Sequence, residues 1–88
     1  MQNERNSTKI MVLSQEQREK LHQRLVAVAD FGGEKRVAEA AGLTVRVIQK
    51  AKAGGNIRVK TLEAIMNGLR IVETERRKKM KKLVRALK

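Results

Sequence analysis

Residues 34–54, with the sequence EKRVAEAAGLTVRVIQKAKAG, are the stretch that decides the fold. Apolar and small side chains recur at helical spacing in its first part and predict a helix over residues 34–41. The inner face of this helix is expected to consist of Val37, Ala38 and Ala41. Gly42 follows where a left-handed turn is needed, because glycine takes that conformation at little cost. We expect Leu43 to cover the turn against the core.

A second helix is expected over residues 45–53, with Thr44 as its N-cap. Its inner face is expected to be formed by Val47, Ile48 and Ala51. Gly54 and Gly55 then end it. Two short helices joined by a tight turn predict a helix-turn-helix, the unit that places its second helix in the DNA major groove.

The segment before this motif predicts a helix over residues 15–29. Ser14 and Gln17 have the spacing of a capping box at its start. The buried stripe is expected to comprise Leu21, Leu25, Val28 and Ala29. Gly32 and Gly33 should stop the helix and turn the chain.

After a loop at residues 56–58, a further helix is expected over residues 59–69. Its inner positions are Leu62, Ile65, Met66 and Leu69. Gly68 is a poor helix former, so this end is expected to fray. Residues 71–88 predict a fifth helix, which is strongly basic and carries a narrow apolar stripe of Met80, Leu83, Val84 and Leu87.

These elements predict an all-α fold, a compact bundle of four to five helices with a helix-turn-helix and a basic C-terminal helix. The expected organisation is a flexible N-terminal arm over residues 1–13, a helix-turn-helix domain over residues 14–70 and a basic helical tail over residues 71–88. A core of this size is thin, because the chain has only 88 residues.

Basic side chains outnumber acidic ones by 21 to 9, which gives a net charge of +12. Residues 34–72 hold eight basic and three acidic side chains, and residues 73–88 hold eight and two. Residues 1–33 are nearly neutral, with five and four. Such a field favours a polyanionic partner.

Several classes of protein are disfavoured by the composition. The chain has no Cys and a single histidine, His22, so neither a metal site nor a histidine-based catalytic site is expected. We therefore expect no cofactor and no enzymatic activity. No apolar run is long enough for a signal peptide or a membrane span, so a cytoplasmic, nucleoid-associated protein without membrane contact is expected.

The aromatic content separates two kinds of nucleic-acid partner. The chain has one Phe and neither Tyr nor Trp. Proteins that hold single strands usually stack bases on aromatic side chains. Double-stranded DNA, held through phosphates and groove edges, is the better match.

The motif resembles the lambda repressor-like family, the Cro/C1-type helix-turn-helix domains. The resemblance is carried by the small Ala38, the turn residues Gly42 and Leu43, and the buried Ile48. It continues through Gly54, Thr61, Leu62, Ile65 and Leu69, and covers about residues 15–69. The chain departs from the family at Glu34, where the family often has a Gln that contacts phosphate, and at Ala51, which is smaller than usual.

The resemblance implies that outward residues of the second motif helix read bases, as a bacterial or phage repressor does. These are Thr44, Val45, Arg46, Gln49 and Lys50. Arginine pairs with guanine and glutamine with adenine through two hydrogen bonds, and a valine contacts the thymine methyl group. Flanking cations are expected to hold phosphates: Lys35, Arg36, Lys52, Arg58 and Lys60.

The alternative reading is a structural or interaction protein of a nucleoprotein assembly, which would bind nucleic acid non-specifically or an acidic protein partner. The tail leaves its own alternatives open. It could extend the grip on phosphate, form a homodimer or bind a protein partner through its apolar stripe, or stay as a solvated helix. Like charges oppose self-association, which favours DNA or an acidic partner.

Overall fold

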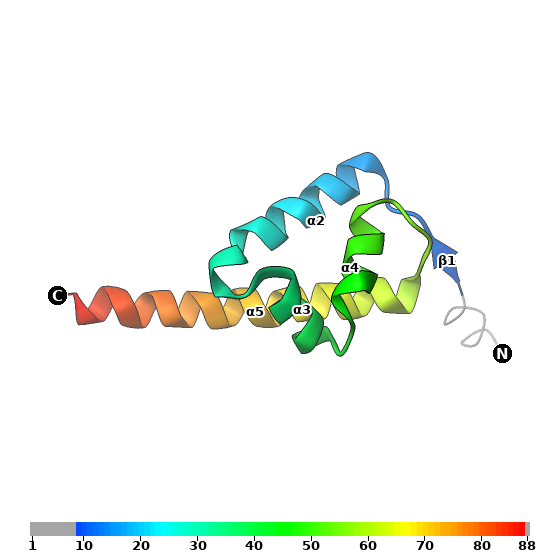
Figure 1. Ribbon diagram of the computed structural model, residues 1–88. Coiled ribbons are helices and arrows are strands. Elements are labelled where there is room, and N and C mark those ends of the chain that lie inside the picture. Colours follow the sequence, from blue (N-terminus) through cyan, green and yellow to red (C-terminus); the bar gives the residue numbers. More distant parts are fainter. Residues whose placement is uncertain (1–8, 88) are drawn as a thin grey trace.

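The computed structural model describes residues 9–87, arranged as shown in Figure 1. Helices α2, α3 and α4 gather around the first part of α5, and the C-terminal end of α5 projects beyond them. Within the described residues the predicted all-α class is confirmed, with one very short β-ribbon added. In chain order the elements are β1 (Ile10–Met11), α2 (Gln15–Ala27), the 3-10 turn η1 (Ala29–Phe31), α3 (Gly33–Ala41), α4 (Val45–Lys52), β2 (Ile57–Arg58) and α5 (Val59–Ala86).

The start of α2 follows the prediction and its end does not. The Ser14 N–H donates to Gln17 Oε1 at 2.8 Å, and Ser14 Oγ accepts from the Gln17 N–H at 3.1 Å, so the capping box is confirmed. The helix ends at Ala27, and the chain tightens into η1 before Gly32 turns it with a φ of 105°. Ala29 is therefore exposed rather than buried, because it has left the α-helical path.

The turn between α3 and α4 has the predicted form. Gly42 takes a φ of 70°, in the left-handed region that favours glycine. The Leu43 N–H then donates to the Ala38 carbonyl at 2.9 Å, which satisfies a carbonyl at the end of α3. The Leu43 side chain packs on the core. Thr44 occupies the N-cap position of α4, but its side chain makes no capping hydrogen bond.

Helix α5 is one continuous helix of 28 residues, which corrects the expected break near residue 70. Gly68 does not fray the helix but is buried against α3. A β-carbon at this position would lie 2.7 Å from the Val37 carbonyl oxygen and 2.9 Å from Ala41 Cβ. The missing side chain lets the backbones of α3 and α5 approach closely, and this packing outweighs the low helix propensity of glycine.

The expected N-terminal arm is ordered in its last part. Ile10 pairs with Arg58 and Met11 with Ile57 in an antiparallel ribbon, and the Val59 N–H donates to the Lys9 carbonyl at 3.0 Å. Leu13 is buried in the core. The flexible arm predicted over residues 1–13 is therefore wrong for residues 9–13, and its residues 1–8 lie outside the described part of the chain.

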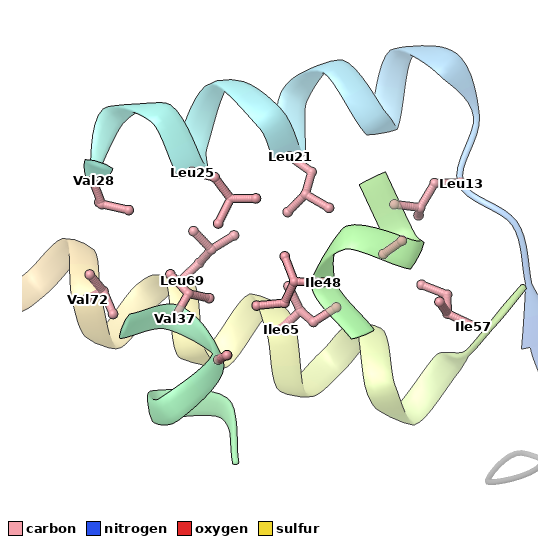
Figure 2. Packing of buried hydrophobic residues seen from close by; sticks show 12 residues of the cluster. Leu13, Leu21, Leu25, Val28, Val37, Ile48, Ile57, Ile65, Leu69 and Val72 are labelled. Atoms are coloured by element: carbon pink, nitrogen blue, oxygen red, sulfur yellow. The ribbon is translucent and has the colours of Figure 1, made fainter. Parts of the chain in front are cut away.

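One apolar core joins all four α-helices and β2. Figure 2 shows the side chains of α2, α4 and α5 pointing toward one another, with Leu13 and Ile57 closing the end nearest the ribbon. No polar or charged side chain is buried among the described residues. The core consists of Leu13, Leu21, Leu25, Val28, Val37, Ala38, Ile48, Ala51, Ile57, Ile65, Leu69 and Val72.

Three ion pairs fasten the middle of α5 to the end of the bundle where α2 meets α3. Glu73 accepts from Arg24 Nε at 2.9 Å and Nη2 at 2.8 Å. Glu75 accepts from Arg36 Nη2 at 2.7 Å. At the next residue of α5, Arg76 donates to both oxygens of Asp30, at 2.9 and 3.0 Å. Residues 73–79 contain no apolar side chain, so ion pairs rather than apolar packing hold this part of α5.

Two of these carboxylates make stability depend on pH. The Arg24 guanidinium holds the pKa of Glu73 below its usual value, and Arg76 does the same for the pKa of Asp30. A carboxylate whose pKa is lower in the folded state stabilises the fold above its ordinary pKa, and this is lost as the pH falls through the folded value. We expect the melting temperature to fall as the pH is lowered from about 5 toward 2.

Glu73→Gln tests this assignment by thermal melts followed with circular dichroism. The variant should lose about 0.2–1 kcal/mol at neutral pH and show a shallower decline in acid, because the side chain is partly exposed. The matched control is Glu63→Gln on the exposed face of the same helix, where the structure gives no ion pair among the described residues. Equal pH profiles for the two variants would contradict the assignment.

Candidate nucleic-acid interface

Helix α4 has one face in the core and one face in solvent. Ile48 and Ala51 are completely buried, and Ile48 lies between Leu21 of α2 and Ile65 of α5 (Figure 2). The opposite face presents the exposed side chains of Arg46, Gln49 and Lys50, with the exposed Thr44 at the N-cap. Within residues 9–87, these four side chains form no hydrogen bond or ion pair with the protein. Their donors and acceptors are therefore open to a ligand.

Val45 is the exception among the five residues expected to contact bases. It is half-buried and packs against the core, so its outward placement is wrong. Val45 lies three residues before Ile48 and therefore shares the inner face of α4. Val47, which was expected inside, lies at the boundary and is half-buried.

The side chain of Lys50 lies across Gly55, just beyond the end of α4. A β-carbon at Gly55 would lie 2.7 Å from Lys50 Cγ. The Gly55 N–H also donates to the Lys50 carbonyl at 2.9 Å, which closes the end of α4. Gly55 thus gives Lys50 the room for this conformation, and a larger residue there would displace the side chain.

The five cations expected to hold phosphate fall into two groups. Lys35 in the first turn of α3, Arg58 in β2 and Lys60 in the first turn of α5 are exposed. Arg36 and Lys52 are two-thirds or more buried and form ion pairs with Glu75 and Glu34. The second group therefore already has anionic partners within the molecule.

The pair between Glu34 and Lys52 joins the first turn of α3 to the last turn of α4. Lys52 Nζ lies 2.5 Å from Glu34 Oε2, and both side chains are about three-quarters buried. The acidic residue at the start of the motif is thus compensated by a lysine 18 residues later. The sequence does not predict this pairing, because nothing in the local pattern of either helix indicates the partner.

Arg18 of α2 is a further cation beside α4, and it is partly buried. Its guanidinium packs on Gly54, so that a β-carbon there would lie 3.1 Å from Arg18 Nη1. Arg18 Nε is buried without a hydrogen-bond partner in the described chain. Arg18 and Lys52 line one shallow hollow between α2 and the end of α4. No feature of the sequence could have indicated this contact, since it depends on how α2 crosses α4.

Comparisons of this chain with protein-family models, with curated proteins and with solved structures find no match. Two further results come from the described residues themselves. They hold no cluster of three or more His, Cys, Asp or Glu side chains that could bind a metal ion. None of the helices over residues 9–87 combines the length and the apolar character that crossing a bilayer requires.

Proposed function

We propose that this chain is a sequence-specific, double-stranded DNA-binding regulator of transcription, similar to a repressor. In this proposal α4 enters the major groove with its exposed face against the bases. Arg46 reads guanine and Gln49 reads adenine, each through two hydrogen bonds, while Lys50 reaches a guanine or a phosphate. Lys35, Arg58 and Lys60 hold the backbone of the duplex.

The proposal rests mainly on one contrast: some polar side chains have partners within the protein, and those on the exposed face of α4 do not. The cations Arg36 of α3 and Lys52 of α4 are satisfied by carboxylates. Arg46, Gln49 and Lys50 are exposed on one helix that is fixed by fully buried residues on its other side. A rigid helix that presents open donors and acceptors is what direct readout of base edges needs.

Two properties favour a duplex over a single strand. The one aromatic side chain, Phe31, packs against the core and lies beneath Lys79, whose Nζ is 5.6 Å from the ring centroid. It is therefore not available as a platform for stacked bases. The net charge of +12 supplies a strong attraction for DNA phosphates without any aromatic contact.

The proposal includes a relation to lambda repressor-like domains, which the sequence of the motif resembles. Under this proposal, the small, buried Ala38 and the left-handed Gly42 set the angle between α3 and α4. Half-sites one helical turn apart are the arrangement that dimers of this architecture use. The second candidate, a structural protein of a nucleoprotein assembly, predicts binding without preference among sequences.

The variant Arg46→Ala tests the proposed function. On a duplex selected by the parent protein, we expect a loss of about 1–3 kcal/mol of discrimination at one base pair, because the two hydrogen bonds to guanine are gone. Binding to random duplex should weaken only slightly. Fluorescence anisotropy with the selected and the random duplex measures both quantities.

Lys60→Ala is the matched control, since it also removes one exposed cation but from the start of α5. It should weaken binding to both duplexes by a similar factor and leave the base preference intact. If Arg46→Ala behaves in the same way as Lys60→Ala, Arg46 does not read a base and the proposal fails at its main residue.

Glu34→Gln is expected to strengthen DNA binding. The change frees Lys52 from its internal partner and removes a negative charge beside the proposed interface. The slope of log K against log salt should steepen by about 1 for each additional phosphate that the protein neutralises. Salt titrations with a random duplex measure this slope.

The control for this variant is Glu16→Gln, which removes an equal charge from an exposed pair with Lys20 on α2. Glu16→Gln should leave the slope nearly unchanged if only the charge near α4 matters. Equal slopes for Glu34→Gln and Glu16→Gln would mean that net charge alone governs binding, against the proposed interface.

A further inference from the structure

The free end of α5 carries an apolar stripe that the rest of the described chain leaves exposed. The C-terminal part of α5 extends past the other helices into solvent (Figure 1). The molecule consequently measures 55 Å along its longest axis against 27 and 20 Å along the others. The exposed apolar side chains of this end are Met80, Leu83, Val84 and Leu87.

This stripe continues the buried face of α5. Ile65, Leu69 and Val72 are completely buried where α5 lies in the bundle. The same helical face continues through Arg76 to Met80, Leu83 and Leu87, at spacings of three and four residues. This face of α5 packs against the bundle up to Val72 and is exposed to solvent once the helix has passed η1. A shallow hollow at this junction is lined by Asp30, Phe31, Arg76, Lys79, Met80 and Leu83.

The base of the free end is fixed in place. The ion pairs of Glu73, Glu75 and Arg76 tie one turn of α5 to α2, α3 and η1. Lys79 lies over the Phe31 ring in the next turn. A helix held in this way is organised before it binds, which lowers the entropy cost of association.

Charge restricts which occupant suits the stripe. Residues 76–87 hold seven basic side chains and no acidic one. A second copy would bring two such segments side by side, and repulsion between their like charges opposes this pairing. A grip on phosphate alone gives no use for four exposed apolar side chains. We propose that this surface binds an acidic amphipathic helix of a partner protein, with apolar residues on the stripe and Asp or Glu side chains at its edges.

A synthetic peptide provides a direct test. The probe is a fluorescent helix of about three heptads with leucine at the two core positions and glutamate at the flanking ones. Its own glutamates discourage self-association. A scrambled peptide of the same composition carries the same charge without an apolar stripe. We expect the patterned peptide to bind the full chain at least about tenfold more tightly than the scrambled one, because leucine burial adds to charge attraction.

The double variant Leu83→Ser/Leu87→Ser should reduce binding of the patterned peptide to the level of the scrambled one. Ile71→Ser is the matched control, since Ile71 is a similarly exposed apolar residue of α5 that lies off the stripe (46% exposed, against 51% for Leu83). Ile71→Ser should retain the affinity of the parent chain. Circular dichroism of all variants checks that the helix content is unchanged.

Three results would overturn the inference. Equal binding of the two peptides would show that charge alone acts. Concentration-dependent dimers in sedimentation, abolished by the double variant, would assign the stripe to a second copy. A loss of duplex binding by the double variant would assign it to DNA. The inference does not rest on the proposed function, because peptide binding and duplex binding are measured separately on the same variants.

Discussion

Replacing Ile48 by alanine is expected to remove a large part of the stability of this protein, about 2–5 kcal/mol. Ile48 is completely buried and lies at the centre of the core, facing Leu21 and Ile65 (Figure 2). The substitution loses apolar burial and leaves a cavity that the short helix α4 cannot close without moving. Domains of this size have a total stability of about 5–15 kcal/mol, so the loss is severe.

Urea denaturation followed by far-UV circular dichroism measures this loss, since the chain has neither Trp nor Tyr to report by fluorescence. Val47→Ala is the matched control on the adjacent residue, which is only half-buried. It should cost clearly less than Ile48→Ala. Similar midpoints for the two variants would contradict the position of Ile48 in the core and hence the orientation of α4.

Gly68→Ala is expected to destabilise the fold by about 1–3 kcal/mol, although alanine is the better helix former. In an exposed helix the same change would stabilise by about 1 kcal/mol. Here the new methyl group would meet the Val37 carbonyl oxygen at 2.7 Å and Ala41 Cβ at 2.9 Å. Because the backbone carbonyl cannot turn aside, α3 must move away from α5.

The neighbouring substitution Asn67→Ala separates propensity from packing. Asn67 is exposed on the same turn of α5, so alanine there should be neutral or slightly stabilising. Thermal melts of the two variants should therefore shift in opposite directions or by clearly different amounts. A stabilising effect of Gly68→Ala would mean that α3 and α5 do not approach closely at this residue.

Local sequence patterns predict much of this fold. The capping box at Ser14, the left-handed Gly42 and the buried Ile48 follow from spacing and backbone preference alone, and the structure has all three. The exposed positions of Arg46, Gln49 and Lys50 follow from the same helical periodicity. These features were predictable because each depends on residues a few positions apart.

Features that depend on distant residues were not predictable in this way. The sequence alone indicates that Gly68 weakens its helix, because its role depends on the contact with α3. The partners in the pairs Arg36–Glu75 and Lys52–Glu34 lie 39 and 18 residues apart. The two-residue strands of the ribbon have no periodicity to detect. Arg36 and Lys52 were therefore predicted to bind phosphate, because their internal carboxylate partners could not be predicted from the sequence.

Selection from a pool of random DNA duplexes at physiological salt is the experiment that shows whether the exposed face of α4 reads base pairs. We expect the parent chain to enrich one short sequence, with a strong preference at the base pair facing Arg46. A palindromic result would in addition establish binding as a dimer. Recovery of duplexes with no enriched sequence would contradict the claim and favour a protein that binds DNA only through its charge.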